Sequence, residues 1–159
     1  MDDAMTLESL ARLVGHWKTE ATHPAMPGVV VNGEVTVEWL EGERFLIHRS
    51  RMDHPDFPDA ISIIGDTEQD RVAKEGDRAV STNGAHLTMH YFDSRGVFRV
   101  YEMAVDDVSW CFWRNAPEFS QRFTGTFEED GDVIAGQSQL SKDGVQWDDD
   151  LQITYRRAT

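Results

Sequence analysis

The chain is short of cysteine, of basic residues and of long apolar runs, and each shortage excludes a class of protein. One cysteine among 159 residues, Cys111, cannot form an internal disulfide, and no Cys-x-x-Cys or Cys/His spacing typical of a zinc site occurs. Only 15 Lys and Arg oppose 29 Asp and Glu, so the formal net charge is −14. This charge disfavours nucleic acids and anionic membranes, because both bind clustered cations. We predict no metal site, no cofactor, no nucleic-acid partner and no membrane partner.

The first ten residues, MDDAMTLESL, are acidic where a secretory signal is basic and then apolar. No stretch approaches the roughly 20 apolar residues of a membrane span. We therefore expect a protein of the reducing cytoplasm. The length suits one domain, and no repeat or linker interrupts it, so we predict a single domain over residues 1–159.

A short N-terminal helix is the only helix that the pattern predicts. Thr6 is a suitable N-cap, and Leu7, Leu10 and Leu13 recur at helical spacing before Gly15 ends the pattern. Beyond Gly15 the apolar period changes to two, which is typical of strands. The predicted strands are 16–23, 30–40, 44–52, 59–65, 86–92, 97–105, 108–115, 120–128, 133–141 and 148–157.

Short turn signals, such as Asp130-Gly131 and Lys142-Asp143-Gly144, separate several of these strands and predict antiparallel hairpins. A meander of about ten strands hides its edges best by closing, so we predict an all-β, up-and-down antiparallel barrel whose interior holds a small ligand. The N-terminal helix would close one end. The charged segment 66–85 lacks a sustained period and is predicted to be a mobile flap or to hold one extra short strand.

The motif Gly15-His16-Trp17 on the first strand, followed by a meander ending in Tyr155-Arg156-Arg157, resembles the calycins, which include lipocalins, fatty-acid-binding proteins and nitrobindin-like bacterial barrels. The phrases GHWKTEATHP, VEWLEGERFLIHRSRMDHPDFPDAISIIG, HYFDSRGVFRVYEM and PEFSQRFTGTFEEDGDVIAG resemble a bacterial calycin-like family of unknown function.

This resemblance implies that Trp17 lies across the closed end of the barrel and that an arginine of the last strand covers its indole. Arg156 or Arg157 could take that part, and we assign it to Arg156. A desolvated guanidinium over an indole gains up to about 2 kcal/mol.

Histidines are the first candidates for chemistry, because their pKa lies nearest neutrality. His48 shares a strand face with Leu46 and Ser50, and the pattern leaves open whether that face is the interior. His90 is a second candidate. His23 lies six residues beyond Trp17 on the same face and should reach the opposite mouth, roughly 20 Å away.

Trp110, Phe112 and Arg114 alternate on one face of their strand. An inward Arg114 would suit a carboxylate or phenolate ligand, and the alternative is an ion pair with Glu102 or another carboxylate. The residues predicted to contact the ligand are His23, Trp39, His48, His90, Tyr101, Trp110 and Arg114.

These residues are compatible with four functions. The first is a carrier or sensor of a small hydrophobic or aromatic molecule, either neutral or anionic. The second is a cofactor-independent isomerase, cyclase or hydrolase with His48 or His90 as general base. Haem binding, which the nitrobindin resemblance could imply, is disfavoured because no histidine follows His90, where that family carries its proximal ligand near the C-terminus. The fourth is an interaction role, with Trp113 and Phe119 forming a homodimer patch.

Overall fold

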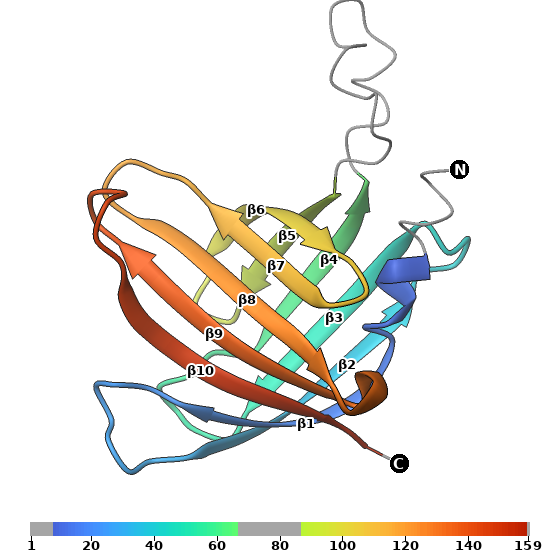
Figure 1. The fold of residues 1–159 in the computed structure, drawn as a ribbon, viewed down its shortest axis with the longest axis horizontal. Helices are drawn as coiled ribbons and strands as arrows, with labels where there is room; N and C mark the ends of the chain where they lie inside the picture. The colour runs from blue at the N-terminus through green and yellow to red at the C-terminus, as the bar shows by residue number, and fades with distance from the viewer. Residues whose placement is uncertain (1–7, 67–86, 159) are drawn as a thin grey trace, which may run out of the picture.

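The structure, a computed structural model, describes residues 8–66 and 87–158 and forms a closed antiparallel barrel of ten strands (Figure 1). All ten predicted strands are confirmed, with ends that differ by one residue at most sites. The predicted N-cap, Thr6, lies outside the described residues, as does the predicted flap 66–85 except for Asp66, which ends a strand. The strands are β1 Gly15–Thr22, β2 Val31–Trp39, β3 Phe45–Met52, β4 Ala60–Asp66, β5 Leu87–Asp93, β6 Phe98–Val105, β7 Ser109–Arg114, β8 Ser120–Glu128, β9 Val133–Ser141 and β10 Asp148–Arg157.

Each strand pairs with its neighbours in the sequence, and β1 also pairs with β10, from Trp17 opposite Arg157 to Thr22 opposite Gln152. Figure 1 shows β10, in red, running beside β1, in blue. Because the first and last strands join, neither is left with unpaired backbone groups along an open edge. The predicted fold class, an up-and-down antiparallel barrel, is confirmed.

Strand alternation determines which side chains fill the interior. In β1 the side chains of Trp17, Thr19 and Ala21 are buried, whereas Lys18 and Glu20 are exposed. The same period of two runs around the barrel, since successive side chains of a strand point to opposite faces. One face of each strand therefore supplies the core, and the other supplies the outer wall.

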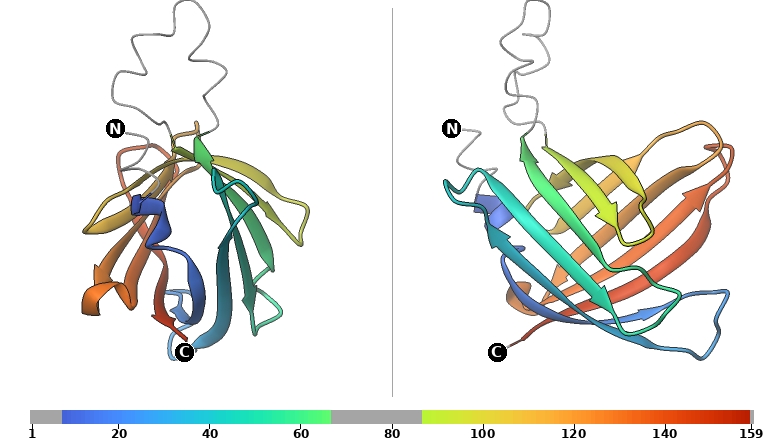
Figure 2. Two further views of the ribbon diagram at one scale, coloured as in Figure 1. Left: turned by 90° about the vertical axis from the view of Figure 1, so that its right-hand side faces the viewer. Right: turned by 180° about the vertical axis from the view of Figure 1, so that it is seen from behind.

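A short helical piece at residues 8–11 lies at one end of the barrel (Figure 2). Leu10 of this piece and Leu13 of the turn that follows it are fully buried in the core, so this segment closes that end as predicted. Trp17 is buried beside them, and its Nε1 donates a hydrogen bond to the carbonyl oxygen of Leu13 at 3.0 Å. This bond joins the helical segment to β1.

The arginine over Trp17 is Arg157, and the assignment to Arg156 is wrong. The Arg157 guanidinium carbon lies 4.2 Å from the centre of the Trp17 ring. In β10, Ile153 and Tyr155 face inward, so alternation turns Arg157 toward the core and leaves Arg156 exposed on the outer wall.

Arg157 also makes four hydrogen bonds. Its guanidinium donates to the carbonyl oxygens of Val14 at 2.7 Å, Arg12 at 3.2 Å and Gly131 at 3.2 Å, and its Nε donates to the Asp132 carboxylate at 3.1 Å. Arg157 therefore connects three separate segments at the closed end.

In the part of the chain that the structure describes, no helix is long and apolar enough to cross a membrane.

Candidate functional site: the barrel cavity

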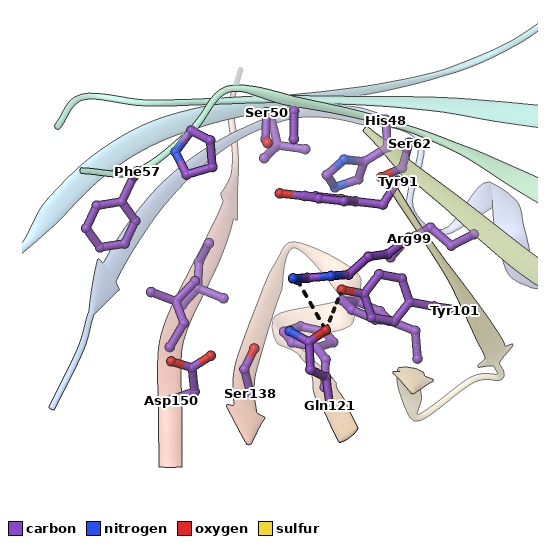
Figure 3. A pocket seen from close by; sticks show the side chains of 18 of the residues that line it. His48, Ser50, Phe57, Ser62, Tyr91, Arg99, Tyr101, Gln121, Ser138 and Asp150 are labelled. Atoms are coloured by element: carbon purple, nitrogen blue, oxygen red, sulfur yellow. Dashed lines mark hydrogen bonds between the residues drawn. The ribbon is translucent and has the colours of Figure 1, made fainter. Parts of the chain in front are cut away.

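The barrel interior holds a cavity of about 330 Å³ that lies beyond the closed end (Figure 3). Its walls combine aromatic rings with a small number of polar and charged groups. This composition and size are typical of small-molecule sites, which range from about 300 to 1,000 Å³. The lining side chains that matter most to its chemistry are His23, His48, Tyr91, Arg99, Tyr101, Trp110, Phe112, Gln121, Phe123, Asp150 and Tyr155.

Aromatic rings form the inner end of the cavity. Phe112 and Phe123 stack at 4.7 Å between ring centres, and Trp110 lies 5.1 Å from Phe123 and 5.8 Å from Tyr155. Tyr155 in turn meets the edge of Trp17 at 6.2 Å. This layer of rings therefore separates the cavity from the closed end.

Two glycines opposite each other in the β8–β9 ladder, Gly125 and Gly136, make room for the Phe123 ring. A Cβ added at Gly136 would lie 2.6 Å from that ring, and one added at Gly125 would lie 3.0 Å from it. The first distance is shorter than real Cβ contacts and the second is tighter than most of them, so the ring packs directly on the backbone of the wall. Space is thereby left in the centre of the barrel.

His48 projects from β3 into this aromatic layer, with its ring centre 6.0 Å from that of Trp110. Burial lowers the pKa of His48 from 6.5 to about 4, because the apolar surroundings disfavour the charged imidazolium. The imidazole is therefore neutral at pH 7. Among the described residues, its Nδ1 and the Nε1 of Trp110 are shielded from solvent and have no hydrogen-bond partner.

A polar cluster on β6 and β8 lies farther out along the cavity. The Gln121 side-chain oxygen accepts hydrogen bonds from the Tyr101 hydroxyl at 3.1 Å and from Arg99 Nη1 at 3.4 Å. Burial raises the pKa of the Tyr101 hydroxyl, so it remains a donor at neutral pH. Arg99 also lies over the Phe119 ring, 5.3 Å from its centre.

Tyr91 and Asp93 form a second polar group where β5 turns into β6. The Tyr91 hydroxyl donates to Asp93 Oδ2 at 2.7 Å, and Arg95 Nη2 donates to the same oxygen at 2.6 Å. The Arg95 hydrogen bonds lower the pKa of Asp93, and burial, followed by the Asp93 contact, raises that of Tyr91. Both groups are held in one protonation state at neutral pH, which suits a rigid turn better than proton transfer.

The mouth of the cavity carries His23, as its spacing from Trp17 predicts. His23 Nε2 lies 2.6 Å from Asp150 Oδ1, and its Nδ1 accepts a hydrogen bond from the backbone nitrogen of Ala25 at 3.0 Å. Both ring nitrogens are engaged. The side chain therefore links the end of β1 to β10 across the rim.

The charged residues of the lining are three arginines, Arg95, Arg99 and Arg122, and one carboxylate, Asp150. Arg95 is paired with Asp93, which lies beside the cavity. Arg122 bonds Gln139 at 2.8 Å and covers the Trp147 ring at 3.9 Å. The lining thus has an excess of positive charge in a chain whose net charge is −14.

Of the residues predicted to contact a ligand, the structure brings His23, His48, Tyr101 and Trp110 into the cavity lining. It does not bring His90, Trp39 or Arg114 there. His90 lies on the outer wall, 6.3 Å from Phe98 between ring centres, because its neighbours Met89 and Tyr91 face inward.

The other two predicted contacts serve the scaffold. Trp39 packs against the core cluster at the end of β2. Arg114 donates to the carbonyl oxygen of Phe119 at 2.9 Å and so holds the connection between β7 and β8. A guanidinium engaged with that turn lies outside the lining, which corrects the prediction that Arg114 meets the ligand.

Sequence reasoning missed Arg99, Gln121, Tyr91 and Phe123. A signal for Arg99 was present, because it lies two residues before Tyr101, which was predicted to face the ligand. Residues two apart in a strand share a face. Gln121 and Phe123 carry a similar signal, since they are themselves two apart in β8, but no predicted site residue lay in that strand.

Comparisons with known proteins define the fold and leave the family open. No family model matches the chain, and no curated protein matches it. Among solved structures, the chain is similar to Rv2717c from M. tuberculosis, with a TM-score of 0.64, 15% identity, and 97% of this chain and 98% of that chain covered. It is also similar to the S-type phycobiliprotein lyase CPES from Guillardia theta, with a TM-score of 0.52, 11% identity, and 99% and 96% covered. These similarities support the calycin-like barrel that the sequence suggested.

Proposed function

We propose that this protein is a carrier or sensor that binds a small, ring-containing apolar molecule in the barrel cavity. The observation that carries the proposal is a cavity of about 330 Å³ whose inner end is made of Trp110, Phe112 and Phe123. Rings of this kind offer large apolar contact area and stack on planar ligands. The likeness in fold to a protein named as a phycobiliprotein lyase is compatible with small-molecule binding in general.

The enzyme alternative has weaker support. A histidine whose pKa is about 4 is a poor general base at pH 7, because efficient bases have a pKa near the working pH. His90, the second candidate base, lies on the outer wall. We therefore favour binding without turnover.

The binding proposal is tested with N-phenyl-1-naphthylamine, a neutral two-ring-system dye whose binding is followed by calorimetry. Ser138 faces the cavity (Figure 3), so Ser138→Trp fills it and should weaken binding at least tenfold. The control is Thr124→Trp on the outer wall of neighbouring β8, where the side chain is exposed and binding should stay within twofold. Equal binding by both variants would contradict a cavity ligand, and so would a wild type that binds neither this dye nor its sulfonated analogue, 1-anilinonaphthalene-8-sulfonate.

A homodimer remains a second prediction. The sequence analysis placed the dimer patch at Trp113 and Phe119, but Phe119 packs against Arg99 and is only partly exposed. Large exposed apolar side chains gather instead on the outer wall of β5 and β6, where Phe92 and Phe98 lie 5.0 Å apart beside Val100. Light scattering that finds a mass of 36 kDa, about twice 18.1 kDa, would support the dimer, and 18 kDa would exclude it.

A further inference from the structure

We infer that the ligand is an aromatic organic anion, and that Arg99 pairs with its acidic group at the outer part of the cavity. The inference rests on the proposed function and adds the chemical class of the ligand and the residue that recognises it. The aromatic body would occupy the inner end beside Trp110 and Phe123, and a carboxylate or sulfonate would lie toward the mouth.

The charge of the lining is the first observation. Three arginines and one aspartate line the cavity, whereas the whole chain carries 29 acidic and 15 basic residues. Asp150, the single lining carboxylate, is engaged with His23 at 2.6 Å. An excess of positive charge along the lining attracts anions to the cavity even when the protein as a whole repels them.

Arg99 is the lining arginine whose charge is left available. Arg95 is neutralised by Asp93. Arg122 also has neutral partners, Gln139 and Trp147, but its side chain is exposed to solvent, whereas Arg99 is half-buried. No Asp or Glu of the described residues lies within 4.0 Å of the half-buried Arg99, whose polar partner is the neutral Gln121 oxygen. A guanidinium partly removed from water without a counter-ion is a costly arrangement that a bound anion relieves.

The surroundings of Arg99 hold it ready for such a ligand. Phe119 supports the guanidinium at 5.3 Å, and Gln121 fixes one edge of it. Figure 3 shows the Arg99 side chain extending into the cavity between Tyr91 and Gln121. The planar guanidinium can donate two parallel hydrogen bonds to an acid, and the amide nitrogen of Gln121 can add a third.

A matched pair of dyes tests the inference. 1-Anilinonaphthalene-8-sulfonate and N-phenyl-1-naphthylamine share the same ring systems, and only the first carries an acid. A hydrogen-bonded ion pair is worth about 1.5–3 kcal/mol, which corresponds to roughly tenfold or more in affinity. We expect the sulfonate to bind the wild type at least tenfold more tightly than the neutral dye at 50 mM salt.

The variants locate the acid. Arg99→Gln should abolish this preference while binding of the neutral dye stays within twofold, and Arg99→Lys, which keeps the charge, should retain most of it. Arg49→Gln removes an exposed arginine from the outer wall of β3, and Phe98→Ser alters the exposed apolar patch. Both controls should leave the affinities for the two dyes unchanged.

Each outcome decides between the claims. If the neutral dye binds in the cavity and the sulfonate gains nothing, or if Arg99→Gln weakens both dyes equally, the anionic ligand is wrong and the cavity function stands. If neither dye binds the wild type, the proposed function fails and this inference fails with it. A salt titration of the wild type gives a second measurement that needs no variant: 1 M NaCl should weaken the sulfonate and spare the neutral dye.

Discussion

Two arginines, one at each end of the barrel interior, differ in how completely their partners are supplied by the protein. Arg157 lies over Trp17 and bonds three backbone carbonyls and one carboxylate. Arg99 lies over Phe119 and bonds one amide oxygen. The same residue type on the same kind of ring is thus a structural tie in one place and an open binding group in the other. The partners that surround each arginine, and not the residue type, determine whether it stabilises the fold or is available to bind a ligand.

The closed end should be the more sensitive to substitution, and Trp17→Ala should show the largest effect. Truncating a buried aromatic side chain costs about 3–5 kcal/mol, because contacts are lost and a cavity remains. Trp17 is 1% exposed and also loses its hydrogen bond to Leu13. The free energy of unfolding in urea measures this loss. A change below 1 kcal/mol, with dye binding abolished, would move Trp17 to the ligand site.

Arg157→Gln should lower the free energy of unfolding by about 2–4 kcal/mol, since it leaves several partly buried carbonyl oxygens without a donor. Arg156→Gln is the matched control one residue away. Arg156 is exposed on the outer wall, so its replacement should change stability by no more than about 0.5 kcal/mol. Equal changes in the free energy of unfolding at the two positions would contradict the structural role of Arg157.

Lowering the pH should destabilise the cavity region through His48. Its pKa is about 4 in the folded protein against an ordinary value of 6.5, so the unfolded chain binds more protons between these values and stability rises with pH across that window. The contribution is fully present above pH 6.5 and is lost as the pH falls toward 4. At 1.36 kcal/mol per pKa unit it amounts to up to about 3 kcal/mol.

The His48 contribution is isolated as the difference in unfolding free energy between wild type and His48→Asn, which does not titrate. That difference should grow from pH 4 to pH 6.5 and then level off. Carboxylates with lowered pKa values, such as Asp93 and Asp143, titrate in both proteins and cancel in the difference. A flat difference curve would show that His48 is not desolvated.

Arg99→Gln should have the smallest effect on stability, within about 0.5 kcal/mol, because the protein supplies Arg99 with few partners. Melting temperature without ligand measures it. A loss of stability as large as that of Arg157→Gln would show that Arg99 is also structural, which would contradict the difference between the two arginines.

The strands of the barrel could be predicted from the sequence more accurately than the residues that line its cavity. The period-two runs and the turn residues located all ten strands, since these signals act within a few residues. Trp17 was recognised from its motif and position, and it lies at the closed end as expected. The assignment to Arg156 overlooks that Arg157 lies two positions after Tyr155, a spacing that indicates a shared face.

The cavity was harder to predict, because its identity depends on the direction in which each strand faces. Both faces of β5 carry aromatic or histidine side chains, so His90 was as plausible a lining residue as Tyr91. Partners distant in sequence also decide the chemistry, as when Gln121 on β8 positions Arg99 on β6. Such pairs become visible only when the alignment of several neighbouring strands is known.

The pairing of β1 with β10 determines the order in which the barrel can form during synthesis. Arg157 donates to the carbonyl oxygen of Val14, 143 positions earlier in the sequence, so the Trp17 indole is not covered until the ribosome has synthesised β10. Contacts of such long range slow folding and leave apolar surface exposed in the meantime. During that interval, the abundance of carboxylates along the chain would keep nascent copies apart through mutual repulsion.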